Sequence, residues 1–541
     1  MKTTTALRIN QQRLVESLRL SFTNSTTVLG ELMQNARRAG AAKVEFDYAP
    51  EAGILHVRDD GCGIESIQTL LTVAESGWDA KTVEREHPFG IGFLSALFAC
   101  DHIVVESKSG RLSANTADIL SFMPLSVTPF EWDGVTTLTL SGFKPSPDSV
   151  RESMRKMAKG FPIPVLFNGE ELRRPWALDS GLEFVKTEIG DVYLSGLGKG
   201  EDWLRTGDRL RIFLLGLPVY AGTSYSCDAG NMIHLDASRF LARLPDRDKL
   251  VDEDQVVRLV AEVVKREAAG RIRQLKKMLA PADFANGYDT IRKWGCLEVL
   301  NDVSVIPARA LACIDGYPVI QGGCYDSNLS DCGQGVTQQE VKSGAVRIVE
   351  LEDFETENSA LWMYAWHKDM RVLHHPLDPG HWVFRRALTL DGQAFQVEIV
   401  GETHRAYFDG QWVCGEAVFC EKYRVIVGGD AVEITSDSIY QSGGDGDCFI
   451  VPKGDVSGVV VQQASSYYED DSLNESVRDE DEWAFGTFAV ANTASNPAEA
   501  MRKLLPSFKG CPSVFGRRFA VVLDAEGNVE SVAEELAQDS N

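Results

Sequence analysis

The sequence predicts an α+β N-terminal domain, in which helices cover one face of a mixed sheet, followed by an α/β middle domain and a mostly β C-terminal region. Three observations lead to this fold class. Helix and strand patterns intermix over residues 1–145. A long helical pattern closes residues 146–280. Short strands and turns dominate residues 281–465, and an acidic linker with a small α/β tail is expected over residues 466–541.

The first domain alternates between the two kinds of element. A helix is expected at 26–40, with Asn24, Ser25 or Thr26 as possible caps and Gly40 as its stop. After it we expect strands at 42–48 and 53–60, a helix at 67–76, a polar stretch at 77–88, a helix at 93–100, and strands at 102–109 and 134–143.

The later elements are expected as follows. The middle domain has a helix at 149–161, a hairpin at 162–172, a buried strand with a proline at 209–222 and a long helix at 252–279. Segments of short strands and turns follow at 316–323, 393–401, 403–413, 423–434 and 457–463. An acidic loop or linker at 467–483, a helix at 497–505 and a strand at 518–527 close the chain.

Composition limits the possible functions. The 541 residues are too many for one hydrophobic core and favour three or four domains. A net charge of −25 makes nucleic acid an unlikely partner, because phosphate binding depends on basic surfaces. Eleven cysteines without a CxxC pair suggest reduced thiols, and neither a signal peptide nor a membrane span is evident. We therefore expect a cytoplasmic protein without membrane contact.

The first helix carries an unusual polar pair in VLGELMQNARRAG. Glu31 and Asn35 are four residues apart, so their side chains lie on one face of the helix. Arg38 falls on the same stripe. A carboxylate stacked on an amide suggests a site that positions water or a cation.

Two glycine-containing turns follow. In GILHVRDDGCGI, Asp59 ends a strand before Gly61 and Gly63, which allow close approach of a flat ligand. An aspartate there could accept a hydrogen bond from an exocyclic amine. In HPFGIGFLSALFAC, Gly90 and Gly92 precede an apolar helix, whose N-terminus favours phosphate. Each turn alone is a weak signal.

Taken together and in this order, the motifs resemble a known family. ELMQNARRAGAAKVEF, VRDDGCGI and HPFGIGFLSA resemble the N, G1 and G2 boxes of the GHKL, or Bergerat-fold, ATPases. That superfamily includes heat-shock protein 90 chaperones, type II topoisomerase subunits, MutL and histidine kinases. The first two boxes are most similar to MutL, whereas LTVAESG and FGIGFLSALFACDHIVVESKSG are most similar to the chaperones.

The resemblance implies a Mg-ATP site with defined roles. Glu31 would be the general base that activates the attacking water, and Asn35 would be the Mg²⁺ ligand. Asp59 would bind the adenine amine. The purine floor would be shaped by Gly61 and Gly63.

The remaining roles fall on later segments. The phosphate loop would consist of Gly90, Ile91, Gly92 and Phe93. A threonine near the adenine would be Thr136, or alternatively Thr137. Residues 64–89 would form a lid over ATP, with Ser76 and Gly77 as its hinge.

Two positions extend or depart from the family pattern. ARLPDRDKLVDEDQ resembles the chaperone loop that sends a basic residue to the γ-phosphate, with Arg247 as candidate and Lys249 as substitute. A charged surface loop is the alternative. Arg38 stands where the family usually has an acid, so it pairs either with ligand oxygens or with a neighbouring acid, or the pocket is altered.

The resemblance therefore implies a Mg-dependent ATPase of the heat-shock protein 90 kind, in which lid closure acts on a protein client or partner. The resemblance also implies a nucleotide-dependent homodimer. A DNA-transaction ATPase of the MutL or topoisomerase kind and a non-hydrolysing nucleotide-gated scaffold are the alternatives. DNA-stimulated activity would favour the first alternative, and equal phosphate release by the wild type and Glu31→Ala would favour the second.

Overall fold

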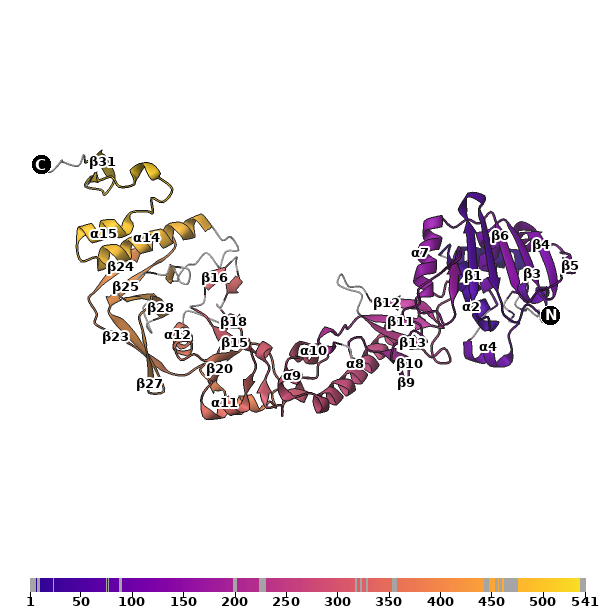
Figure 1. Ribbon diagram of the computed structural model, residues 1–541, viewed down its shortest axis with the longest axis horizontal. Coiled ribbons are helices and arrows are strands. Elements are labelled where there is room, and N and C mark those ends of the chain that lie inside the picture. Colours follow the sequence, from indigo (N-terminus) through magenta and orange to yellow (C-terminus); the bar gives the residue numbers. More distant parts are fainter. Residues whose placement is uncertain are drawn as a thin grey trace, which may run out of the picture. The chain divides into compact units, whose positions relative to one another are not determined.

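The computed structural model divides into two compact units, Met1–Val299 and Leu300–Asn541, which are described separately. Figure 1 gives the labels of their helices and strands. The residues described are 6, 10–22, 24–73, 75, 77–86, 90–197, 202–222, 230–316, 319–321, 324–326, 329–352, 358–441, 447–452, 456, 460–461 and 475–535.

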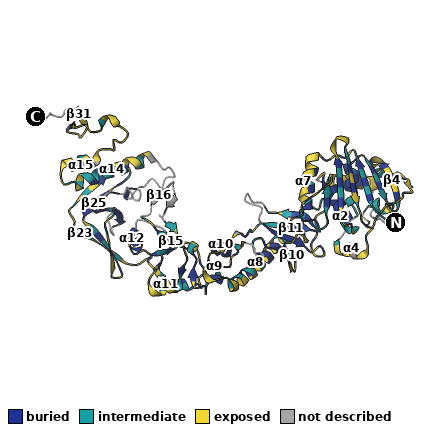
Figure 2. Cartoon of the chain, in the orientation of Figure 1, coloured by how far each residue is buried: buried dark blue, intermediate teal, exposed yellow. Residues whose placement is uncertain are grey.

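An eight-stranded mixed sheet forms the centre of the N-terminal region. Its spatial order is β5-β4-β3-β6-β2-β1-β7-β8, and only β1 and β7 pair in parallel. The strands are β1 (Val44–Ala49), β2 (Ile54–Asp59), β3 (His102–Ser107), β4 (Gly110–Asn115), β5 (Val127–Thr128), β6 (Thr136–Ser141), β7 (Val165–Phe167) and β8 (Glu170–Glu171). Burial alternates along β1, β3 and β6, so one face of the sheet is covered (Figure 2).

Helices supply that cover, and their apolar side chains share one core with the sheet. The helices are α1 (Gln11–Ser21), α2 (Thr27–Arg38), α3 (Ile67–Leu70), α4 (Ala80–Glu86), α5 (Gly92–Ala99), α6 (Thr116–Leu120) and α7 (Pro147–Ala158). The helix expected at 67–76 is wrong in length, because α3 ends at Leu70. The polar stretch after it contains α4, which the sequence reading missed.

A second sheet completes the first unit in the order β12-β11-β13-β10-β9. Its strands are β9 (Val185–Thr187), β10 (Gly190–Tyr193), β11 (Leu210–Leu214), β12 (Leu217–Ala221) and β13 (Asn231–Leu235), and the helices α8 (Glu253–Met278), α9 (Pro281–Ala285) and α10 (Tyr288–Lys293) follow. The single buried strand expected at 209–222 is wrong. It is the β11–β12 hairpin, because Leu215 and Gly216 both adopt positive φ and close a two-residue turn.

The second unit is largely β. Its strands are β14 (Val305–Ile306), β15 (Leu311–Ile314), β16 (Val319–Gln321), β17 (Cys324–Asp326), β18 (Leu329–Asp331), β19 (Val336–Thr337), β20 (Ile348–Glu350), β21 (Arg371–Leu373), β22 (Leu388–Thr389), β23 (Phe395–Val400), β24 (His404–Asp409), β25 (Cys414–Cys420), β26 (Lys422–Val427), β27 (Asp430–Ile434), β28 (Ser438–Gln441), β29 (Asp447–Pro452), β30 (Phe519–Leu523) and β31 (Val529–Glu534). Its longer helices are α11 (Gln338–Ser343), α12 (Ser359–His367), α14 (Glu475–Thr493) and α15 (Pro497–Leu504).

Two expectations for this unit are wrong. The described part of the acidic stretch at 467–483 is helical rather than a loop, because it begins α14. There the carboxylate of Asp481 accepts hydrogen bonds from the backbone of Gln411 and Trp412, which buries it. In the strand expected at 457–463, the described residues Val460 and Val461 are helical. The rest of these two segments lies outside the described residues.

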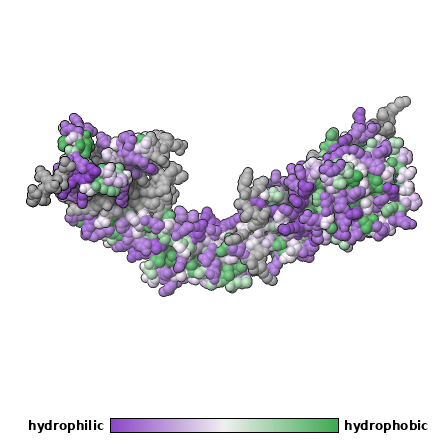
Figure 3. Space-filling model, turned by 45° about the horizontal axis from the view of Figure 1, so that its top comes forward, coloured by the Kyte–Doolittle hydropathy of each residue, from purple (hydrophilic) through white to green (hydrophobic). Residues whose placement is uncertain are grey.

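The α+β class, with a mixed N-terminal sheet and a largely β C-terminal region, is confirmed. The β30–β31 hairpin stands apart from the larger sheets and leaves Phe519, Val529 and Val532 exposed. Apolar patches are visible at that end of the chain in Figure 3. Within the described residues, no helix has the length and apolarity needed to span a membrane.

Candidate active site

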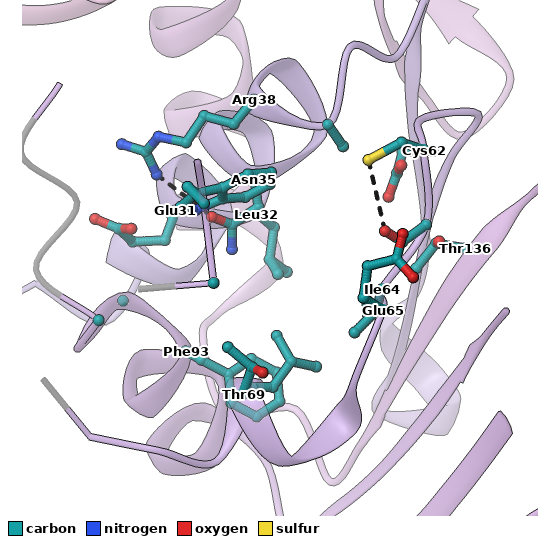
Figure 4. A pocket seen from close by; sticks show the side chains of 18 of the residues that line it. Glu31, Leu32, Asn35, Arg38, Cys62, Ile64, Glu65, Thr69, Phe93 and Thr136 are labelled. Carbon is teal, nitrogen blue, oxygen red and sulfur yellow. Dashed lines mark hydrogen bonds between the residues drawn. The ribbon is translucent and has the colours of Figure 1, made fainter. Parts of the chain in front are cut away.

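One cavity of about 380 Å³ brings the three sequence motifs together in the first unit. This volume lies within the range of small-molecule sites. The predicted site residues that line it are Glu31, Asn35, Asp59, Gly63, Gly90, Gly92, Phe93, Thr136 and Arg247. Figure 4 shows two opposed walls, with Glu31, Asn35 and Arg38 on one side and Cys62 and Thr136 on the other.

The helical wall centres on the carboxylate of Glu31, whose side chain is only 7% exposed. Its Oε1 lies 2.9 Å from Nε of Arg247, so Glu31 and Arg247 form a buried ion pair. A Cβ on Gly92 would overlap this carboxylate, so the glycine permits α5 to begin beside it. The cavity therefore presents an acid that is already held by a cation from a distant part of the chain.

The chain around Arg247 is fixed against helix α2. Thr27 Oγ1 donates to Asp246 Oδ1 at 2.6 Å, one residue before the arginine. Gln34 Nε2 donates to the carbonyl of Leu215 at 2.8 Å in the β11–β12 turn. Arg247 itself has φ of +54°, a conformation that is uncommon outside glycine. These contacts explain why α2 is buried on nearly all sides, which its amphipathic pattern does not indicate.

Arg38 lies beside this ion pair, with its side chain only 2% exposed. Its Nε contacts Glu86 Oε2 at 3.0 Å, and its Nη1 donates weakly to Asn35 Oδ1 at 3.4 Å. Among the described residues, its buried Nη2 has no hydrogen-bond partner. Burial, followed by the positive charge of Arg247, lowers the pKa of Arg38. Of the alternatives left open by the sequence, the structure shows pairing with a neighbouring acid.

That acid, Glu86, ends helix α4 in the segment expected to form the lid. It also accepts hydrogen bonds from Arg37, so two arginines of α2 hold one carboxylate. Burial opposes ionisation of Glu86, but the hydrogen bonds and charges of Arg37 and Arg38 outweigh it and lower its pKa. The described part of the lid segment is therefore fastened to the helix that carries Glu31. The expected hinge residue Ser76 lies outside the described residues.

The opposite wall is formed by strand ends and the turn after β2. Asp59 Oδ1 accepts a hydrogen bond from the Gly61 N–H at 3.1 Å. Burial raises the pKa of Asp59, and the Gly61 hydrogen bond offsets part of this effect. A Cβ on Gly61 would overlap Ala39, and Cys62 N–H donates to the Ala39 carbonyl at 2.9 Å. These contacts fix the turn against the end of α2.

Thr136 faces Asp59 across the β2–β6 pair and lines the cavity, whereas Thr137 is not among the lining residues. This follows from the alternation of side chains along a strand. Thr136 Oγ1 lies 2.9 Å from Ser107 Oγ on β3, and Ser107 also accepts from the Ile64 N–H at 2.8 Å. The sequence reading missed Ser107, because nothing distinguishes a serine at a strand end from an ordinary surface residue.

Three other predicted residues lie outside the lining set. Gly61 packs on Ala39 as described, and Ile91 precedes α5 as its N-cap residue. Lys249 belongs to a separate depression with Arg243, so Arg247 and not its substitute reaches the cavity. Their predicted roles in nucleotide binding remain predictions.

The donor set is compatible with Mg²⁺ held jointly by protein and phosphate. Asn35 offers an amide oxygen, a hard ligand, at the cavity wall. Within the described residues, no group of three His, Cys, Asp or Glu side chains is placed to hold a metal ion. Mg²⁺ usually keeps several waters and takes its other ligands from substrate phosphates, so one protein oxygen fits this pattern.

Comparison with known families bears on the same segment. Residues 23–123 match the family model described as Histidine kinase-, DNA gyrase B-, and HSP90-like ATPase. This GHKL match covers α2, the β1–β2 hairpin, the lid segment and α5. The match supports ATP binding and hydrolysis in general for the matched segment. The Thr136 wall and Arg247 lie beyond the matched residues.

Proposed function

We propose that this protein is a Mg-dependent ATPase, most similar to the heat-shock protein 90 branch, that couples ATP hydrolysis to rearrangement against a protein client or partner. The observation that carries the proposal is the convergence of the three GHKL motifs around one cavity that contains a buried carboxylate. The carboxylate and the flanking arginines provide what phosphoryl transfer requires, namely a positioned water and charge compensation.

In this proposal the helical wall performs the chemistry. Glu31 orients and deprotonates the attacking water, while Arg38 and Arg247, which line the cavity beside it, would meet the phosphate end of the nucleotide. Asn35 would hold Mg²⁺ together with phosphate oxygens, and the metal would supply positive charge against the triphosphate. Because Arg247 now pairs with Glu31, it must turn toward phosphate before Glu31 can act as a base. Residues Gly90 to Phe93 cradle the phosphates with backbone N–H groups.

The proposed coupling between ATP hydrolysis and a partner rests on which segments of the chain contact α2 at the cavity. Arg247 comes from the loop after the second sheet, and Glu86 comes from the lid helix. A ligand that draws Arg247 to itself weakens the contact between that loop and α2. A ligand that draws Arg38 to itself weakens the contact between the lid helix and α2. This arrangement converts nucleotide binding into movement of the lid and of the middle region. Such movement could act on a protein client or regulate a homodimer.

A non-hydrolysing, nucleotide-gated scaffold is the second candidate. The Glu31–Arg247 ion pair favours it, because a carboxylate held by arginine is a poor base. If the arginine stayed there after nucleotide binding, the cavity would bind ATP without turning it over. The two candidates differ only in what Glu31 does once ATP is present.

Phosphate release from Mg-ATP by the full chain decides between them. The ATPase proposal expects release that depends on Mg²⁺ and is lost in Glu31→Ala, while calorimetry still detects ADP binding. Equal background release by both proteins, with ADP bound, would support the scaffold. Stimulation by duplex DNA would instead support a DNA-transaction ATPase of the MutL or topoisomerase kind. Absence of adenine nucleotide binding at millimolar concentration would overturn the proposal.

A further inference from the structure

A buried hydroxyl pair lies behind the sheet wall of the cavity. Ser107, fully buried at the end of β3, accepts a hydrogen bond from the Ile64 N–H at 2.8 Å. Its Oγ also lies 2.9 Å from Thr136 Oγ1, and either hydroxyl could be the donor. Only Thr136 of this pair lines the cavity.

In either direction of this bond, one of the two hydroxyl hydrogens has no acceptor among the described residues, and only Thr136 lines the cavity where a ligand could accept it. If Thr136 donated to Ser107, the Ser107 hydrogen would have no acceptor among the described residues, inside a fully buried position. A buried donor without a partner is unfavourable. If Ser107 donates to Thr136, both bonds of Ser107 are satisfied. The Thr136 hydrogen is then free to turn toward the cavity, where a ligand or water can accept it.

The neighbouring polar groups indicate which ligand atom this hydrogen could bind. Asp59 lies directly opposite Thr136 in the β2–β6 register and supplies an acceptor. Cys62 Sγ, on the same wall, is already used as a donor, because it contacts the Gly63 carbonyl. The wall therefore presents an acceptor and a donor side by side. Adenine offers the complement, an amine next to ring nitrogen N1.

We propose that Ser107 is a positioning residue for base recognition, which directs the Thr136 hydroxyl hydrogen into the cavity toward adenine N1 while Asp59 accepts from the adjacent amine. This inference rests on the proposed function, because it assumes that an adenine nucleotide occupies the cavity. It adds a residue that does not itself touch the ligand. Its effect must therefore appear in the selectivity for N1 and not merely in overall affinity.

The test measures binding of ADP and of 1-deaza-ADP, in which N1 is replaced by C–H, to the full chain by calorimetry. We expect the wild type to bind ADP about tenfold more tightly than 1-deaza-ADP, as one hydrogen bond in a buried site implies. Ser107→Ala should reduce this ratio toward one. Thr136→Val, which removes the hydroxyl at nearly constant shape, should do the same. Ser113→Ala, on the neighbouring strand and away from the cavity, is the matched control and should retain the ratio.

The outcomes separate this inference from the proposed function. A tenfold ratio that persists in a folded Ser107→Ala protein would overturn the positioning role. A wild type that binds both nucleotides equally, or that is sensitive to 7-deaza-ADP instead, would overturn the assignment to N1. A protein that binds no adenine nucleotide would overturn the proposed function itself. Thermal unfolding of each variant shows whether a variant that no longer discriminates between ADP and 1-deaza-ADP is still folded.

Discussion

The two walls of the cavity are built differently. The helical wall gathers Glu31, Arg38, Glu86 and Arg247, which come from α2, the lid helix and the loop before α8. The sheet wall joins Asp59, Ser107 and Thr136 through adjacent strand ends. The first wall holds charges on three different segments, and the second holds hydrogen-bonding groups on adjacent strands of one sheet. We infer that the helical wall governs turnover and that the sheet wall governs which nucleotide binds.

Loss of the carboxylate on the helical wall should have the largest effect. Glu31→Ala should lower kcat for ATP about 10³-fold, because a general base contributes on the order of 10²–10⁴. The Kd for ADP should change little. Glu65→Gln is the matched control, since Glu65 lines the same cavity but is exposed. Phosphate release and calorimetry measure the two quantities, and a comparable loss in the control would contradict the assignment.

Removal of the cation from the middle region should be next in size. Arg247→Ala should lower kcat about 10²-fold, the effect expected when one preorganised charge at the reacting phosphate is lost. Lys249→Ala should leave kcat near the wild-type value, because Lys249 does not line the cavity. Since Arg247→Ala leaves Glu31 buried without its partner, thermal unfolding must be measured beside turnover. Similar kcat values for both variants would remove Arg247 from the mechanism.

On the sheet wall, Asp59→Asn should weaken ADP binding about thirtyfold, the loss of one charged hydrogen bond in a buried site. At saturating ATP its kcat should stay within a few-fold of the wild type. Titration calorimetry and saturation kinetics measure the pair of values. A variant that lost kcat with Kd intact would place Asp59 with the catalytic groups and break the comparison.

The lid contact should have a smaller effect of opposite sign. Glu86→Gln removes the charge that holds Arg37 and Arg38, so Arg38 becomes free to meet phosphate. We expect ATP affinity to rise about fivefold, which corresponds to about 1 kcal/mol, the usual size of such a contact. Glu84→Gln serves as the control, because Glu84 is on the same helix but does not line the cavity. Weaker ATP binding in Glu86→Gln would contradict the idea that Glu86 and the phosphates of ATP compete for Arg38.

The smallest expected effect is a pH dependence of nucleotide affinity. Burial raises the pKa of Asp59, so its carboxylate becomes protonated at a higher pH than an ordinary aspartate. The protonated form is a poorer acceptor for the adenine amine. ADP affinity should therefore fall on acidification, beginning above the usual aspartate range, and Asp59→Asn should abolish the dependence. A wild-type Kd that stays constant from pH 7 to pH 4.5 would contradict this role.

The residues of the three motifs could be predicted because their spacing along the chain is enough to bring their side chains together. Glu31 and Asn35 follow the helical period, and Asp59 ends a strand before glycines. Sequence could not show Ser107, whose importance depends on hydrogens shared with Ile64 and Thr136 across strands. It also could not show α4, since AKTVERE has no apolar stripe and gains its place through the pairing of Glu86 with α2.

The β11–β12 turn shows a different limit. Its apolar run, FLLGLPV, fits a buried strand as well as a hairpin, and only the positive φ of Leu215 and Gly216 distinguishes them. The turn matters for the site because the Leu215 carbonyl holds Gln34 on α2. Contacts of this kind join residues far apart in the chain, so no local pattern reports them.

The central claim, that the two walls enclose one adenine nucleotide and divide catalysis from recognition, is tested most directly by measuring kcat for ATP and Kd for ADP in Glu31→Ala and Asp59→Asn side by side. The account predicts that the first variant loses kcat and keeps Kd, and that the second loses Kd and keeps kcat at saturation. If both variants changed the same parameter, or if neither changed either one, the account would be contradicted.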